Sequence, residues 1–214
     1  MKEKYFTHEN IADKAKTLKL EAAGRHKLKF TAKNPALMVL DMQKFFQETS
    51  SHAQIPSFDV IVPGIQGLIY GFKNKGLPVI FTKHLNTPEN AFMMDEWWRD
   101  IITTDSIYSG IVEDFDTSGH VVIEKSQYDA FYKTGLDGML RELKINNLVI
   151  TGVMTHLCCE TTTRSAFVRG FRTFFTVDGT ATYNEQFHRN TLINLAHGFS
   201  VPVLTDEILE KIND

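Results

Sequence analysis

Short apolar runs of strand length alternate along this chain with segments whose apolar residues recur at helical spacing. The run at residues 36–40 is apolar throughout, which suits a strand that is covered on both faces. Ile65, Leu68, Ile69 and Phe72 then fall on one face of a helix. Such alternation is typical of a parallel sheet with helices on both faces, joined by right-handed crossovers. We therefore expect a three-layer α/β/α fold with strands near residues 36–40, 78–82, 121–123, 148–151, 173–177 and 201–204.

Length, composition and charge narrow the classes of protein to consider. A chain of 214 residues can bury its own core, and we expect a helical N-terminal arm at residues 1–33 followed by one domain at residues 34–214. A net charge of −3 supplies no positive field for nucleic acid or an anionic membrane surface. No apolar run approaches membrane-spanning length, so we expect a cytoplasmic protein whose partner is a small molecule.

The cysteines of the chain, Cys158 and Cys159, are neighbours in sequence. A disulfide between them would be strained and would close no useful loop, which leaves thiol chemistry or core packing. They follow an apolar run and Gly152, at the predicted start of a helix. A helix N-terminus favours the thiolate, which is a nucleophile. Buried cysteine is also common as a small core residue, so the cysteines alone do not decide between the two roles.

Chemically capable side chains follow three of the predicted strands. Asp41 comes directly after the first, Lys125 follows the third and Cys158 lies just past the fourth. Each has a plain structural alternative, because Asp41 could cap a helix, Lys125 could be solvated and Cys158 could be packing. Ligands of open α/β sheets bind beyond the carboxyl ends of the strands, where these side chains would meet. Their coincidence at one edge favours a functional site.

Three segments of the chain resemble the signature segments of the isochorismatase-like cysteine hydrolase family. They read LMVLDMQ at residues 37–43, KSQYDAF at 125–131 and GVMTHLCCETT at 152–162. Their order and spacing also match, and the likeness extends from about residue 35 to the C-terminus. The resemblance implies a six-stranded parallel sheet in the order 3-2-1-4-5-6 and a hydrolase domain at residues 34–214.

The same resemblance implies roles for individual residues. Cys158 would be the nucleophile of a triad, with Asp41 as the proton acceptor and Lys125 as the cation that lowers the thiol pKa. The backbone N–H groups of Met154 and Cys158 would form an oxyanion hole, with a cis peptide between Val153 and Met154.

Family members that hydrolyse nicotinamide build a metal site from an aspartate and closely following histidines, in the loop after the second strand. Here that region reads KHLNTP at residues 83–88, with His84 as its one histidine. A lone histidine does not make a metal site. We therefore expect no bound zinc or iron and no other cofactor, which argues against nicotinamide as the substrate.

Aromatic rings and histidines near these segments are candidates for the substrate pocket. Residues 86–116 have no clean period and contain the neighbours Trp97 and Trp98, and a segment of this length is usually a functional lid or wall. Aromatic residues at such positions are more often part of the core. The candidates for substrate binding are Phe46, Tyr128, Trp97, His84 and His156.

Enzymatic and non-enzymatic roles both remain open at this stage. Cys158 favours acyl transfer, so we rank hydrolysis of a small amide through a thioester first. Residues 155–157 and the N-terminal extension resemble the branch that hydrolyses the vinyl ether of isochorismate, in which a glycine replaces the nucleophile. The third alternative is a catalytically degenerate oligomer that binds a small ligand. The resemblance implies a homo-oligomer, either a dimer or a tetramer.

Overall fold

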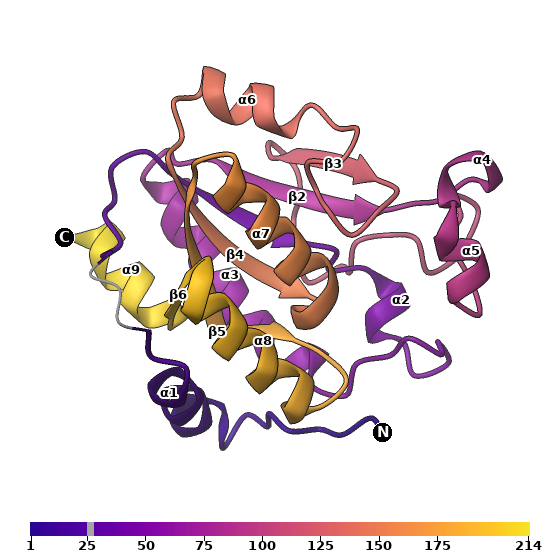
Figure 1. Cartoon of the computed structure of the whole chain (residues 1–214), viewed down its shortest axis with the longest axis horizontal. Helices are drawn as coiled ribbons and strands as arrows, with labels where there is room; N and C mark the ends of the chain where they lie inside the picture. The colour runs from indigo at the N-terminus through magenta and orange to yellow at the C-terminus, as the bar shows by residue number, and fades with distance from the viewer. Residues whose placement is uncertain (25–27) are drawn as a thin grey trace.

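The computed structural model describes residues 1–24 and 28–214. Its centre is a six-stranded sheet whose strands all run parallel, in the order β3-β2-β1-β4-β5-β6 (Figure 1). This confirms the expected strand order and the α/β class. The strands are β1 (Pro35–Leu40), β2 (Val79–His84), β3 (Val121–Lys125), β4 (Asn147–Val153), β5 (Arg172–Ala181) and β6 (Val201–Val203).

Helices cover both faces of the sheet and complete the three layers. They are α1 (Ile11–Glu21), α2 (Lys44–Gln47), α3 (Phe58–Asn74), α4 (Pro88–Ala91), α5 (Met93–Trp97), α6 (Leu136–Glu142), α7 (Glu160–Val168), α8 (Glu185–Gly198) and α9 (Thr205–Asn213). α3 and α9 pack together on one face, whereas α7 and α8 pack together in front of the sheet in Figure 1. Every residue of β1 is buried in consequence. Among the described residues, no helix is both long enough and apolar enough to cross a membrane.

The N-terminal residues pack on the domain instead of extending away from it. Tyr5 and Phe6 are buried, and α1 buries Ala15 and Leu18. The helix lies against β5 and α8. The part of the predicted arm at residues 1–24 is therefore packed on the domain. Residues 25–27 of the predicted arm lie outside the described residues, and its boundary at residue 33 stays a prediction.

The contact between β1 and β4 fixes the geometry at the edge where the site forms. Gly152 pairs with Leu40, and a Cβ atom on Gly152 would lie 2.1 Å from the Leu40 carbonyl oxygen. The φ of Gly152 is +107°, which L side chains rarely adopt. Glycine is therefore required for the two strands to approach each other immediately before Asp41 and the turn that carries Cys158.

Candidate active site

Three buried side chains meet at the carboxyl edge of the sheet. Lys125 Nζ lies 2.7 Å from Asp41 Oδ2 and 3.4 Å from Cys158 Sγ. The side chains of Lys125 and Asp41 are fully buried, and Cys158 is 4% exposed. The structure thus brings together the three residues that the sequence singled out at three strand ends. A thiol beside an ammonium and a carboxylate has the partners that thiol activation needs.

β2 lies between the strands that carry Asp41 and Lys125, and the long side chain of Lys125 reaches across its end. The reach is needed because the two strands are separated by β2 and neighbouring strands are about 4.8 Å apart. The Thr82 hydroxyl of β2 donates a hydrogen bond to Asp41 Oδ1 at 2.6 Å, so both carboxylate oxygens of Asp41 have a partner. Asp41 has a φ of +51°, in the sparsely populated left-handed region, where the chain turns out of β1.

The ion pair and the thiol differ in their protonation. Burial alone would raise the pKa of Asp41, but the Lys125 ammonium, together with His84 and the hydrogen bonds from Cys158 and Lys125, holds that pKa below its ordinary value. Burial alone would lower the pKa of Lys125, but Asp41 and Cys158 together outweigh it, and the pKa is raised. Burial raises the pKa of the Cys158 thiol far above its ordinary value, and Lys125 offsets only part of this. The free site therefore holds a carboxylate, an ammonium and a protonated thiol, whereas the helix N-terminus had predicted a thiolate.

Cys158 lies in η1, a π-helical turn at Thr155–Cys159 that leads into α7. The peptide between Val153 and Met154 is cis, as the family resemblance implied. Met154 and Cys158 both line the pocket, and within the described chain no backbone acceptor pairs with the N–H of Met154. That N–H is available to a ligand oxygen. Cys159, in contrast, is fully buried in the core.

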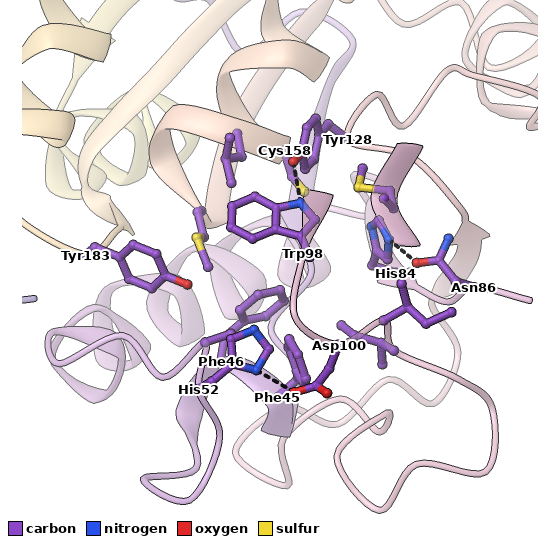
Figure 2. Close-up of a pocket in the computed structure, with 16 residues that line it drawn as sticks. Phe45, Phe46, His52, His84, Asn86, Trp98, Asp100, Tyr128, Cys158 and Tyr183 are labelled. Atoms are coloured by element: carbon purple, nitrogen blue, oxygen red, sulfur yellow. Dashed lines mark hydrogen bonds and ion pairs between the residues drawn. The ribbon is translucent and has the colours of Figure 1, made fainter. Parts of the chain in front are cut away.

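A pocket opens at Cys158, and most of its wall is apolar or aromatic (Figure 2). Its cavity volume is about 60 Å³. One water needs roughly 10–15 Å³ on the same measure, so the pocket suits a small ligand. The lining residues are Phe45, Phe46, His52, Ala53, His84, Asn86, Met94, Trp98, Asp100, Ile101, Ile102, Tyr128, Met154, Leu157, Cys158 and Tyr183.

Phe46, Tyr128 and His84, all predicted to bind substrate, line this pocket. His84 Nε2 lies 2.8 Å from Asn86 Oδ1, and its Nδ1 lies 3.4 Å from Lys125 Nζ. Burial lowers the pKa of His84 to about 4, so the ring is neutral. With Nε2–H donating to Asn86, Nδ1 is left to accept from Lys125. His84 therefore helps to hold the ammonium of Lys125 in place.

The structure places the other two candidates, Trp97 and His156, outside the pocket. Trp97 is 74% exposed, and its neighbour Trp98 lines the pocket instead, because successive residues of a helix end point in different directions. His156 Nδ1 lies 2.6 Å from Thr182 Oγ1, and its ring stacks on Phe187 with centroids 4.5 Å apart. It therefore lies beside η1 and does not line the cavity.

Several polar groups of the pocket were missed in the sequence. Trp98 Nε1 donates to the Tyr128 hydroxyl at 2.7 Å, and His52 Nδ1 lies 2.9 Å from Asp100 Oδ2. Figure 2 shows the His52–Asp100 pair at the opposite end of the pocket from Cys158, with Tyr183 at one side. These residues come from irregular segments. Such segments have no regular spacing from which the direction of a side chain could be predicted.

A metal ion does not suit the residues at this edge. Ligand atoms of Asp41, His84 and Cys158 lie within 4.8 Å of one another, which is close enough for shared coordination. Lys125 Nζ, however, already contacts an atom of each, at 2.7, 3.4 and 3.4 Å. A divalent cation would have to displace this ammonium against strong repulsion at low dielectric.

Comparison with known proteins gives consistent matches. Residues 35–207 match the family model described as Isochorismatase domain. The chain is 37% identical over 186 residues to Nicotinamidase 3 from Arabidopsis thaliana, which covers 85% of this chain and 90% of that protein. A cysteine hydrolase from Pseudomonas syringae pv. phaseolicola 1448A has a TM-score of 0.80 at 23% identity, over 87% of this chain and 96% of that one. N-carbamoylsarcosine amidase from Thermoplasma acidophilum has a TM-score of 0.71 at 25% identity, over 81% and 97%.

Proposed function

Because the chain belongs to the isochorismatase-like hydrolase family, we propose that it hydrolyses the C–N bond of a small amide-type substrate, with Cys158 as the nucleophile. The observation that carries this proposal is the contact of the Lys125 ammonium with both the Asp41 carboxylate and the Cys158 thiol. A nucleophile beside a base, with a cation to hold the charges, is the arrangement that acyl transfer uses. Two similar proteins are named as a nicotinamidase and an N-carbamoylsarcosine amidase.

In the first half of the reaction, the Cys158 sulfur attacks the carbonyl carbon while its proton passes to Asp41. Ligand atoms of the two residues lie within 4.8 Å, and the ionised carboxylate accepts one proton. Negative charge develops on the carbonyl oxygen, which the backbone N–H groups of Met154 and Cys158 stabilise. The C–N bond then breaks, and ammonia or an amine leaves with the proton from Asp41. A thioester on Cys158 remains.

In the second half, Asp41 takes a proton from water, and the resulting hydroxide attacks the thioester carbon. The C–S bond breaks, the acid is released, and the sulfur regains its proton from Asp41. One water is consumed and one acid and one amine are formed, so atoms and charges balance. Lys125 keeps Asp41 a carboxylate between these transfers and faces the sulfur when it is negative.

The protonated state of the free thiol gives Asp41 a necessary role. A thiol whose pKa is raised by burial holds almost no thiolate at neutral pH, so sulfur attack requires a base in the same step. Asp41 remains ionised at neutral pH because Lys125, with which it is paired, helps to hold its pKa low. The Asp41 carboxylate can therefore serve as this base. The mechanism therefore depends on proton transfer within the site and not on a stored thiolate.

The second candidate is hydrolysis of a vinyl ether of the isochorismate type, which the matching family model favours by its description. That reaction needs a proton donor and water but no sulfur nucleophile. The thiol of Cys158 would be superfluous there, which is why amide hydrolysis ranks first.

The test is a panel of small primary amides, including nicotinamide, together with ureas, N-carbamoyl compounds and isochorismate. Wild type, Cys158→Ala and the matched variant Cys159→Ala are assayed for release of ammonia or of the vinyl-ether product. We expect Cys158→Ala to lose at least about 1,000-fold in amide hydrolysis, while Cys159→Ala stays active. Full amidase activity in Cys158→Ala would end the proposal. Hydrolysis of isochorismate alone, unchanged in Cys158→Ala, would establish the second candidate.

A further inference from the structure

Lys2, near the N-terminus, joins two walls of the pocket. Its Nζ donates to the carbonyl oxygen of His52 at 2.5 Å and lies 4.6 Å from the centroid of the Tyr183 ring. His52 and Tyr183 both line the pocket, although one precedes α3 and the other precedes α8. In Figure 1 the N-terminus lies beside the loop that leads into α8. One side chain therefore fastens two pocket walls that are distant in sequence.

The backbone of residues 1–6, here called the N-terminal segment, is tied to the loop that carries Tyr183. The N–H of Glu3 donates to the Tyr183 carbonyl oxygen at 2.8 Å, and the N–H of Glu185 donates to Glu3 Oε1 at 2.7 Å. Asn184 Nδ2 donates to the Met1 carbonyl oxygen at 3.1 Å. The position of Tyr183 thus depends on contacts with the start of the chain.

Tyr5 connects the N-terminal segment to the turn that carries the nucleophile. Its hydroxyl accepts the N–H of Thr182 at 3.1 Å and lies 3.0 Å from His188 Nδ1. Thr155 Oγ1 lies 3.2 Å from the same His188 Nδ1. Burial lowers the pKa of His188 to about 3, so this ring is a neutral hydrogen-bonding link. Thr155 opens η1 and directly follows Met154, so the link ends beside the proposed oxyanion hole.

The anchor of the N-terminal segment on the body is apolar as well as polar. Phe6 is fully buried, its N–H donates to Ser57 Oγ at 3.1 Å, and Ser57 Oγ donates back to the Phe6 carbonyl oxygen at 3.4 Å. Tyr5 and Phe6 pack against each other with ring centroids 4.6 Å apart. Because the segment is anchored in this way, Lys2 and Tyr5 can hold the groups that they contact in fixed positions.

We propose that Lys2 and Tyr5 are positioning residues for the reaction at Cys158. Lys2 sets the distance between the His52 and Tyr183 walls, and Tyr5 holds η1 through His188 and Thr155. Neither residue touches the reacting atoms. This inference rests on the proposed function for its kinetic test, and it adds a part of the chain that lies outside residues 35–207, where the family model matches.

The kinetic test separates the two roles. Lys2→Met opens the walls, so we expect KM to rise by about 5- to 10-fold with kcat within twofold, and Lys2→Arg to restore most of the loss. Tyr5→Phe keeps the ring and loses the link, so kcat falls by about 5- to 10-fold with KM little changed. Lys4→Met, at an exposed neighbouring lysine, is the control and stays at wild-type values. Wild-type kinetics in Lys2→Met and Tyr5→Phe would overturn the proposal.

Thr155→Val and Thr155→Ser test the same link from its other end. Valine removes the hydroxyl that reaches His188, so Thr155→Val should reproduce the kcat loss of Tyr5→Phe. Serine keeps the hydroxyl, so Thr155→Ser should retain wild-type kcat. Equal kcat values in the two variants would contradict a role for the link. This pair decides the question even if Tyr5→Phe does not fold.

A readout independent of activity keeps this inference separate from the proposed function. Alkylation of Cys158 by iodoacetamide, followed by peptide mass spectrometry, should be at least about threefold faster in Lys2→Met than in wild type or Lys4→Met. Hydrogen–deuterium exchange in the peptide that contains Thr155–Cys159 should rise in Tyr5→Phe. If no amide is hydrolysed by wild type, the proposed function fails, but these rates still decide the positioning roles. Unchanged alkylation in Lys2→Met and unchanged exchange in Tyr5→Phe would overturn them.

Discussion

The floor and the wall of the pocket are built on different principles. The floor, defined as Asp41, Lys125 and Cys158, is buried at the carboxyl edge of the sheet, and Asp41 and Lys125 in it form an ion pair. The wall, by which we mean here the pocket residues within 86–116 and not the His52 and Tyr183 walls, comes from short helices and irregular chain. This segment bridges to the main body at Gln43 and Ile111. The sheet fixes the floor through many backbone contacts, whereas the wall depends on individual side-chain packing. Substitutions in the floor should therefore cause large losses of activity or stability, and substitutions in the wall should cause smaller ones.

The largest expected effect is at the ion pair of the floor. Asp41→Asn or Lys125→Met should each lower amide hydrolysis by at least about 1,000-fold and lower the free energy of unfolding by about 3–5 kcal/mol, because one buried charge loses its partner. The double variant leaves no unpaired charge there, so its stability loss should be smaller than the sum of the two. Urea unfolding and steady-state kinetics measure these effects. Additive losses in the double variant would contradict a coupled pair.

The next effect concerns the strand contact under the floor. Gly152→Ala places a Cβ atom 2.1 Å from the Leu40 carbonyl oxygen at a φ of +107°, so it should lower the free energy of unfolding by about 3 kcal/mol or more. Gly138→Ala, inside α6 and with nothing within 4 Å, is the matched control and should be neutral or stabilising by up to about 1 kcal/mol. Similar thermal unfolding of both variants would show that β1 and β4 can separate without cost.

Substitutions in the wall should have smaller effects on KM, and a substitution of Trp98 should have a larger effect than one of Trp97. Trp98→Phe keeps a ring in the pocket but removes the N–H that donates to the Tyr128 hydroxyl, so KM should rise by about 3- to 10-fold. Trp97→Phe changes an exposed ring and should leave KM within twofold. Equal effects of the two substitutions would contradict the placement of Trp98 as the pocket residue.

The last prediction concerns the pH dependence of stability. Burial lowers the pKa of His188 to about 3, below its unfolded value near 6.5. The unfolded chain therefore binds more protons between these values, and stability that is fully present above pH 6.5 is lost as pH falls toward 3. His188→Gln removes this contribution, so the slope of unfolding free energy between pH 4 and 6 should fall by up to about 1.4 kcal/mol per pH unit. An unchanged slope would mean that His188 does not carry this linkage.

The positions of the floor residues could be predicted because they follow from local pattern and topology. Apolar runs of strand length located the strand ends, and parallel strands bring their carboxyl ends to one edge. Asp41, Lys125 and Cys158 were found in this way. The sequence did not favour Trp98 over Trp97, because both lie in a segment without a clean hydrophobic period. Which ring points into the pocket depends on where α5 ends. The contact of His156 with Thr182, from a distant loop, could not be read from the sequence for a similar reason.

The sequence by itself determined the α/β class, the strand order through the family resemblance, and the identity of the three floor residues. Only the tertiary structure decided that Lys125 reaches across β2, that burial raises the pKa of the Cys158 thiol, and that Lys2 contacts the pocket walls while Tyr5 is linked to η1. The physical reason is that periodicity and strand ends are properties of neighbouring residues. Burial, pKa and contacts between distant segments exist only once the chain has packed.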